Sequence, residues 1–293
     1  MVFMKILTPL HVSGVWIPRY TSNPLETGSI GVGLNLALYS IGESRPGPCR
    51  IVFNEKSVLD KQAEIICREA GRAVETRIVS PVDLGEGFGV SANILITHTL
   101  GSYLQAGKPS LKALQLAHTL EVEYKTGLGD VIAEYTGGVA VRVEPGAPGV
   151  GRAYRLIPRE YVNLLVVRTG LREDTGRMLS RMNKELLDYG VFLLNRFIET
   201  EDLRVFFESA RLFTSRLFDY SLIQDVVESL KGVVDYYMKK SALIIWIERE
   251  YIDEAVSILE KRGYKPLSTT ISHIGVTCVY STKPPEKNES INT

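Results

Sequence analysis

The sequence predicts a two-domain α+β fold, and four observations carry this prediction. The chain has 293 residues, a length that accommodates two domains of ordinary size. Strand-like and helix-like segments alternate along it, and 45% of its residues are hydrophobic, enough for a solvent-excluded core. The character of the sequence changes after residue 158, where a long run rich in Leu, Phe and Arg follows. We therefore expect an amino-terminal domain at 1–158, a carboxyl-terminal domain at 159–281 and a frayed polar tail at 282–293.

The first half is expected to begin with strands at 5–10 and 51–53. Apolar residues recur at helical spacing through 57–74, which predicts an amphipathic helix. Residues 75–84 read as extended, and 91–107 are apolar on nearly every face, as in a buried helix. The remaining elements predicted for this half are a helix at 110–125 and strands broken by turns over 131–158, with a loop at 144–151.

The second half is expected to open with a strand at 161–169, after which helices fill the chain from about 176 to 239. An apolar strand at 241–248 follows, and then an amphipathic helix at 251–263 that a glycine ends. The last predicted element is a strand at 271–281. No internal repeat is evident along the chain.

The composition argues against several classes of protein. Lys plus Arg equals Asp plus Glu at 34 each, so the chain lacks the basic excess that is typical of nucleic-acid binders. Its three scattered cysteines predict neither a disulfide framework nor a zinc site, and we expect them to be small core residues in a reducing compartment. The amino terminus lacks the continuous apolar segment of a signal peptide, and the run at 242–247 is too short to span a bilayer. A soluble cytoplasmic protein is expected, with no nucleic-acid or membrane partner.

A glycine-rich turn precedes the predicted buried helix and indicates an anion site. Gly85, Gly87 and Gly89 alternate ahead of Ser91. Glycine allows positive φ and close approach of a ligand to backbone amides, while the first turn of a helix offers unpaired N–H groups and a positive dipole end. Such a turn can bind phosphate without a cationic side chain, and Ser91 could cap the helix or hold a phosphate or metal ion. The alternative is an ordinary capped turn, because the pattern matches neither the dinucleotide nor the P-loop motif.

A second motif makes the phosphate site the better interpretation. The segment TGLGD at 126–130 is followed by Gly137, Gly138 and EPGAPG. With the upstream glycine turn, it resembles the GHMP kinase superfamily of small-molecule kinases, in which a glycine loop binds the nucleotide and a later motif supplies a catalytic aspartate. Together with PLHVSGVWIP and TGSIGVG near the start, these motifs are similar to those of archaeal-type pantoate kinases. In the second half the resemblance is thin, since ISHIGVTC at 271–278 keeps one glycine of a third motif.

The resemblance implies a fold and a set of roles. The fold would be the two-domain GHMP kinase fold, with an amino-terminal domain like the second domain of ribosomal protein S5 and a ferredoxin-like α+β carboxyl-terminal domain. Asp130 matches the catalytic aspartate, and Glu121 matches the carboxylate that binds Mg²⁺, with Ser91 as a further metal ligand. The residues implied for ATP phosphates are Gly85, Gly87, Gly89 and Ser91, and those implied for pantoate are Ser29, His118 and Arg142.

Three positions depart from the pattern of the superfamily. Asp83 stands where proline is usual, and Asn93 is bulkier than the usual small residue. Val90 replaces the first serine of the nucleotide loop, which shifts the expected metal contact to Ser91.

The chemistry of pantoate suits the matched residues. Arg142 offers a planar fork for the carboxylate. His118 and Ser29 can hydrogen-bond to hydroxyl groups, and Asp130 can orient the attacking hydroxyl and accept its proton. Val12, Val15 or Trp16 would form the apolar wall that the two methyl groups require.

Each matched residue also has an ordinary structural explanation. Asp130 could form a turn, Glu121 could be solvated helix surface, and His118 could be a satisfied core histidine. Arg142 could point outward from an alternating strand, and Ser29 could only shape its loop. For the isolated His11 and His273 we expect structural roles, and for the Leu- and Phe-rich helices at 185–235 a place in the core or at a dimer surface.

The function implied by the resemblance is phosphorylation of the 4-hydroxyl of (R)-pantoate by MgATP, as a step toward coenzyme A in a homodimeric enzyme. One alternative is a kinase of the same scaffold that acts on shikimate, homoserine or mevalonate. The other is a ligand-sensing regulator that has lost catalysis.

Overall fold

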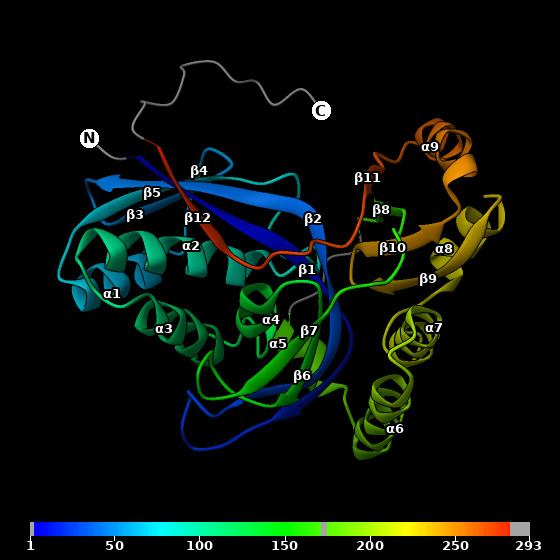
Figure 1. The fold of residues 1–293 in the computed structure, drawn as a ribbon, viewed down its shortest axis with the longest axis horizontal. Helices are drawn as coiled ribbons and strands as arrows, with labels where there is room; N and C mark the ends of the chain where they lie inside the picture. The colour runs from blue at the N-terminus through cyan, green and yellow to red at the C-terminus, as the bar shows by residue number, and fades with distance from the viewer. Residues whose placement is uncertain (1–2, 171–174, 282–293) are drawn as a thin grey trace.

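The computed structural model describes residues 3–170 and 175–281, so the polar tail expected at 282–293 lies outside the described residues. Two sheets and the helices packed on them make up the described chain (Figure 1). The elements up to residue 156 are, in order, β1 (Phe3–Arg19), β2 (Gly28–Pro46), β3 (Arg50–Phe53), β4 (Lys56–Val58), α1 (Asp60–Ala70), β5 (Val74–Val79), α2 (Val90–Gln105), α3 (Ser110–Glu123), α4 (Asp130–Thr136), β6 (Val139–Glu144) and β7 (Arg152–Leu156).

The later elements build the second sheet and then return to the first. They are β8 (Leu164–Arg168), α5 (Thr175–Ser180), α6 (Lys184–Thr200), α7 (Leu203–Thr214), α8 (Ser221–Glu228), β9 (Val233–Lys239), β10 (Ala242–Ile247), a 3₁₀ turn (Arg249–Tyr251), α9 (Ile252–Lys261), β11 (Leu267–Thr269) and β12 (Thr277–Ser281).

The first sheet is built around the long antiparallel pair β1 and β2. Its strand order is β12-β1-β2-β5-β3-β4, and β6 pairs with β2 and with β7. The β1–β2 register shifts after Pro9 and again after Ser13, and such bulges bend a long strand and accommodate a proline. Helices α1 to α4 lie on one face of this sheet (Figure 1). On the other face α7 packs so closely on β1 that a Cβ at Gly14 would lie 2.7 Å from the Phe206 ring.

Helix α2 is the buried helix that the sequence predicts. From Val90 to Tyr103 every residue except Ser91 is buried, because α1, α3 and the sheet surround the helix. A helix that is apolar on all faces is stable only in such a position. The packing of α2 on β1 thereby fixes the position of its amino terminus, just after Phe88, whose carbonyl accepts a hydrogen bond from the His11 amide.

The second sheet has the order β11-β8-β10-β9 and is antiparallel throughout. Every residue of β10 is buried, and β9 and β10 are joined by a two-residue turn of Lys240 and Ser241. Lys240 has a φ of 55°, which is uncommon for a residue with a side chain and typical of tight hairpin turns.

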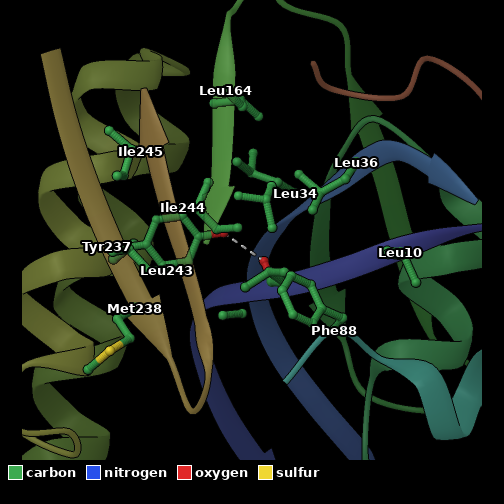
Figure 2. Packing of buried hydrophobic residues seen from close by; sticks show 14 of the residues in the cluster. Leu10, Leu34, Leu36, Phe88, Leu164, Tyr237, Met238, Leu243, Ile244 and Ile245 are labelled. Atoms are coloured by element: carbon green, nitrogen blue, oxygen red, sulfur yellow. Dashed lines mark hydrogen bonds between the residues drawn. The ribbon is translucent and has the colours of Figure 1, made fainter. Parts of the chain in front are cut away.

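One continuous core connects the two sheets. Leu10, Leu34 and Leu36 of the first sheet belong to the same buried cluster as Leu243 and Ile244 of the second. Figure 2 shows Tyr237 of β9 pointing toward β1, where its hydroxyl donates a hydrogen bond of 3.0 Å to the Val12 carbonyl. The β9–β10 hairpin is therefore held in a defined position against the first sheet.

Several predicted elements are wrong or incomplete. Residues 131–136 were expected to be strand but form α4, because a short apolar run does not distinguish a strand from a buried helix. Residues 233–239 were expected to be helix but form β9, whose β-branched and aromatic side chains favour a strand. Strand β2 was not foreseen, and β1 extends well beyond 5–10. The final strand is shorter than 271–281 and pairs with β1.

The change from one sheet to the other falls between Leu156 and Leu164, while β12 brings the chain back to the first sheet. A domain boundary at residue 158 stays a prediction. All three cysteines are free, and Cys67 is buried, whereas Cys49 and Cys278 are half-buried rather than core residues. Among the described helices, none has both the length and the apolar composition needed to cross a bilayer.

Candidate active site

The glycine-rich turn before α2 has the backbone conformation that requires glycine. Gly85, Gly87 and Gly89 all have positive φ, at 89°, 99° and 71°. A Cβ at Gly87 would lie 2.4 Å from the Lys239 carbonyl oxygen, and one at Gly89 would lie 2.3 Å from a carboxylate oxygen of Glu134. Gly85 has no neighbour within 4 Å of such a Cβ. Gly87 and Gly89 therefore allow the turn to pack closely on Lys239 and Glu134, whereas Gly85 faces open space.

The amino terminus of α2 opens onto a cavity of about 200 Å³. Gly89 is the N-cap residue, no side chain caps the helix, and its first turn carries no acidic residue. The free N–H groups and the dipole of the first turn give this end a partial positive charge of roughly half a unit. The residues that line the cavity include Gly85, Gly87, Gly89, Ser91, Thr126, Thr175, Lys239 and Lys240. We call this space the nucleotide cavity.

The two lysines of this cavity were not foreseen from the sequence. They come from the β9–β10 hairpin, about 150 residues after the glycine turn along the chain, where no local pattern links the hairpin to that turn. The Lys240 ammonium donates a hydrogen bond of 2.8 Å to Thr175 Oγ1. The anion site thus combines backbone amides with cationic side chains.

Glu121 lies in contact with Ser91, which lines this cavity, while Glu121 itself is 1% exposed and is absent from the described lining. The Ser91 hydroxyl donates to Glu121 Oε1, which also accepts a 3.1 Å hydrogen bond from Thr126 Oγ1. Burial, with the charge of Asp130 adding to it, raises the pKa of the Glu121 carboxyl to about 7. Glu121 Oε2 has no hydrogen-bond partner among the described residues. Its burial rules out the interpretation of Glu121 as solvated helix surface.

These oxygen atoms fit Mg²⁺ that is also bound by phosphate. Mg²⁺ in nucleotide sites is held by one or two protein oxygens together with phosphate oxygens and water. An unpartnered carboxylate oxygen beside a hydroxyl supplies such a pair. No group of three or more His, Cys, Asp and Glu that could hold a metal ion occurs in the described part of the chain, so the protein alone offers no complete metal cage.

Asp130 is the first residue of α4 and lies among cationic and polar groups. Its Oδ1 accepts a 3.5 Å hydrogen bond from Ser13 Oγ and lies 3.9 Å from both His11 Nε2 and Lys239 Nζ. Burial acts to raise the pKa of this carboxyl, but Lys239, His11 and Arg142 together hold it below its usual value. Asp130 is therefore ionised at neutral pH, as a proton acceptor must be.

A second, small cavity of about 30 Å³ adjoins Asp130. It shares Thr175 and Lys239 with the nucleotide cavity, so the two spaces are neighbours. Of the three residues considered for an apolar wall, Trp16 lines this space, whereas Val12 and Val15 are fully buried in the core. The described residues that line it are Ser13, Trp16, Ser29, Leu128, Gly129, Asp130, Thr175, Met178, Leu179 and Lys239. We call this space the acceptor cavity.

Arg142 lies behind the acceptor cavity and not on its lining. It is 1% exposed, which rules out an outward-pointing position on β6. Its Nη1 donates a hydrogen bond of 3.2 Å to His11 Nε2, and a Cβ at Gly129 would lie 2.9 Å from its Nε. Burial lowers the pKa of His11 to about 3, so the imidazole is neutral and can accept from the guanidinium. His11, expected to be isolated, belongs to this group.

Ser29 and His118 differ in their relation to the acceptor cavity. Ser29 is buried and lines it, with Oγ close to Gly129. His118 donates a 2.8 Å hydrogen bond from Nε2 to the Thr27 carbonyl, and burial lowers its pKa. His118 is absent from the described lining of both cavities, so in this geometry it fixes the start of β2, which carries Ser29.

Glu134 and Gly275 lie near the site, although neither lines one of the two cavities. Glu134, beneath Gly89, is fully buried, and burial, reinforced by Asp130 and Glu121, raises its pKa well above the usual value, so the carboxyl is neutral. Gly275 of the third motif packs against the end of α4, where a Cβ would lie 2.1 Å from the Tyr135 carbonyl oxygen. None of residues 271–278 lines either cavity.

The chain is similar in sequence to curated pantoate kinases. It is 32% identical to the pantoate kinase of Thermococcus kodakarensis over 201 residues, which cover 64% of this chain and 64% of that protein. This match spans less than two thirds of that relative's length. Identity to the pantoate kinase of Methanocaldococcus jannaschii is 26% over 268 residues, which cover 87% of this chain and 97% of that protein. No family model matches the chain.

Solved structures have the same fold. A phosphotransferase related to the CoA biosynthesis pathway matches with a TM-score of 0.79 and 23% identity, over 95% of this chain and 99% of that one. A mevalonate kinase matches with a TM-score of 0.66 and 13% identity, over 92% of this chain and 99% of that one. These likenesses confirm the α+β, two-domain GHMP kinase fold that the motifs predict.

Proposed function

We propose that this chain, which has the GHMP kinase fold and is similar in sequence to pantoate kinases, transfers the γ-phosphoryl group of ATP to the 4-hydroxyl of (R)-pantoate. The observation that carries the proposal is the position of Asp130. Its carboxylate faces a small cavity that shares two lining residues, Thr175 and Lys239, with the cavity at the amino terminus of α2. A phosphate donor in one space and an alcohol in the other would meet beside this carboxylate.

The nucleotide cavity would hold the triphosphate of ATP. The first-turn amides of α2, the open backbone at Gly85 and the hydroxyl of Ser91 supply hydrogen-bond donors to phosphate oxygens. Glu121 and Ser91 would hold Mg²⁺, which offsets the charge of the phosphates when it is bound. Phosphoryl transfer depends mainly on positioning and on charge neutralisation, and this part of the protein can supply both.

Asp130 would act on the acceptor. The pantoate 4-oxygen forms a bond to the γ-phosphorus, the bond from that phosphorus to the bridging oxygen of ADP breaks, and the hydroxyl proton passes to Asp130 Oδ. The products are 4-phosphopantoate and ADP. Because the pKa of Asp130 is held below its usual value, the carboxylate is a weak base that accepts the proton late, once the new bond has developed.

The acceptor cavity has chemistry suited to pantoate but must enlarge to hold it. Trp16, Met178 and Leu179 offer an apolar wall for the methyl groups, and Ser13 and Ser29 can bind hydroxyls. About 30 Å³ is the share of a single water molecule in the liquid. Binding of pantoate therefore requires a movement of lining side chains, which include Met178 and Leu179 of α5. Arg142, predicted to bind the carboxylate, and His118 would act from behind the lining unless this movement exposes them.

A panel of acceptors with coupled detection of ADP tests the proposal. We expect kcat/KM for (R)-pantoate to exceed that for homoserine, shikimate and mevalonate by on the order of 10²-fold or more, because the polar groups of the site are left unpaired by a wrong acceptor. A preference for another acceptor of the panel would indicate that the chain is a kinase for that acceptor and not for pantoate. Nucleotide binding with no ADP released for any acceptor would instead support a ligand sensor. A place in coenzyme A biosynthesis, a cytoplasmic location and a homodimer accompany the proposal as predictions.

A further inference from the structure

We infer that Lys239 is the cation that contacts the phosphoryl group as it passes from ATP to the acceptor, so that the second sheet supplies part of the active site. This inference rests on the proposed kinase function. Lys239 matches none of the residues that the family resemblance indicates, and it lies in the half of the chain where that resemblance is thin.

The position of Lys239 between the two cavities supports this role. It lines both the nucleotide cavity and the acceptor cavity. Its Nζ is 3.9 Å from Asp130 Oδ1 and 5.5 Å from the centroid of the Trp16 ring, and its side chain is 9% exposed. The ammonium group therefore lies at the boundary that the phosphoryl group must cross, next to the carboxylate that faces the attacking hydroxyl.

Three features of the fold hold Lys239 in this position. Tyr237 points toward β1 (Figure 2), and residues two apart in a strand point to the same face, so the strand pattern directs Lys239 to that face as well. Tyr237 is fully buried and anchored to the Val12 carbonyl. The Lys239 carbonyl packs on Gly87, and Lys240 adopts a left-handed conformation that turns the chain directly after it. Uncommon backbone conformations of this kind persist where the surrounding structure holds them, often at functional sites.

The charges around Lys239 favour contact with phosphate over a purely structural ion pair. The charges of Arg142 and Lys240 also lower the pKa of Asp130, so Lys239 is not the sole source of compensating charge for this carboxylate. Arg142 is enclosed behind Gly129, whereas Lys239 reaches the open space of both cavities. A lysine ammonium is a compact charge with three donors, which suits a group whose oxygens change position during the reaction.

Replacement of Lys239 by Met removes the charge and keeps most of the apolar stem. We expect kcat to fall by about 10²- to 10³-fold, as for the loss of one group that stabilises a transition state, with little change in the KM for pantoate. Binding is measured separately by calorimetry with a non-hydrolysable ATP analogue and with ADP. Affinity for the analogue should fall and affinity for ADP should not, because ADP lacks the phosphoryl group that Lys239 contacts.

Two further variants make the comparison decisive. Lys231→Met removes an exposed lysine just before β9, paired with Glu254 at 3.0 Å, and should behave as the wild type. Lys239→Arg keeps the charge and should retain more turnover than Lys239→Met. If Lys239→Met does not fold, as judged by circular dichroism, the same contrast between ATP analogue and ADP is measured on Lys239→Arg, whose altered geometry should weaken binding of the analogue alone.

The possible failures are distinct. An equal loss of affinity for ADP and for the ATP analogue would place Lys239 on the other phosphates and overturn the inference. A higher KM for pantoate with unchanged kcat would make Lys239 the partner of the acceptor carboxylate and would also overturn it. In both cases the wild type still binds nucleotide and phosphorylates pantoate. A wild type that binds neither nucleotide refutes the proposed kinase function itself, and the inference with it.

Discussion

Replacement of Asp130 by Asn is expected to leave the protein folded and to lower kcat by about 10²- to 10⁴-fold, the contribution typical of a positioned base. Asn has nearly the same shape, and the groups around residue 130 include Ser13 and His11, which can also hydrogen-bond to an amide. What the variant loses is the acceptor for the hydroxyl proton. Steady-state kinetics with pantoate and ATP measure the loss, and a thermal melt reports the fold.

The matched control is Asp188→Asn, which makes the same chemical change at an exposed position on α6. It should have wild-type kinetics. Nucleotide affinity of Asp130→Asn should also be close to that of the wild type, because Asp130 lines the acceptor cavity and is absent from the described lining of the nucleotide cavity. Near-normal turnover in Asp130→Asn would remove this residue from the mechanism.

Replacement of Glu121 by Gln is expected to lower turnover on the order of 10²-fold at a fixed, moderate Mg²⁺ concentration, with partial recovery when Mg²⁺ is raised. Gln keeps an oxygen that can accept from Ser91 and Thr126, so the packing is preserved while the charged ligand is lost. Turnover measured against Mg²⁺ concentration reports the effect. Glu123→Gln, at an exposed position near the end of the same helix, is the control and should follow the wild type.

The raised pKa of Glu121 predicts that Mg²⁺ affinity and protein stability depend on pH. Metal binding requires the ionised carboxylate, and the pKa of Glu121 is raised to about 7, so the apparent affinity for Mg²⁺ should increase as pH rises through this range. In the metal-free protein, the contribution of Glu121 to stability is fully present below its ordinary pKa of 4.5 and is lost as pH rises through about 7. Glu121→Gln should lack both effects. Identical Mg²⁺ and pH profiles for variant and wild type would exclude Glu121 as the metal ligand.

Local patterns in the sequence predict the half of the site that lies on contiguous motifs. The glycine turn leads into a buried helix, and Asp130, the last residue of TGLGD, is the first residue of α4. These features depend on backbone conformation and short spacing. Residues 131–136, predicted to be a strand, form a helix because the short segment VIAEYT is compatible with either element until tertiary packing decides.

The remaining part of the site arises from contacts that no local pattern contains. Lys239 lies close to Asp130 because the contacts of Tyr237 with Val12 and of Gly87 with the Lys239 carbonyl hold β9 in position. In the sequence analysis a helix is expected at 233–239, where the structure has this strand. A sequence signal was present, since VVDYYMK and ALIIWI are β-favouring runs separated by two residues, as in a hairpin. The burial of Arg142 behind Gly129 likewise follows from the pairing of β6 with β2, a long-range contact.

The most direct test is a crystal structure of Asp130→Asn with (R)-pantoate and a non-hydrolysable ATP analogue. Our account predicts a triphosphate on the first turn of α2 between Gly85 and Ser91, and the pantoate 4-hydroxyl beside residue 130 with the γ-phosphate directly opposite. A triphosphate bound away from this turn, or pantoate bound where its hydroxyl cannot reach residue 130, would contradict it.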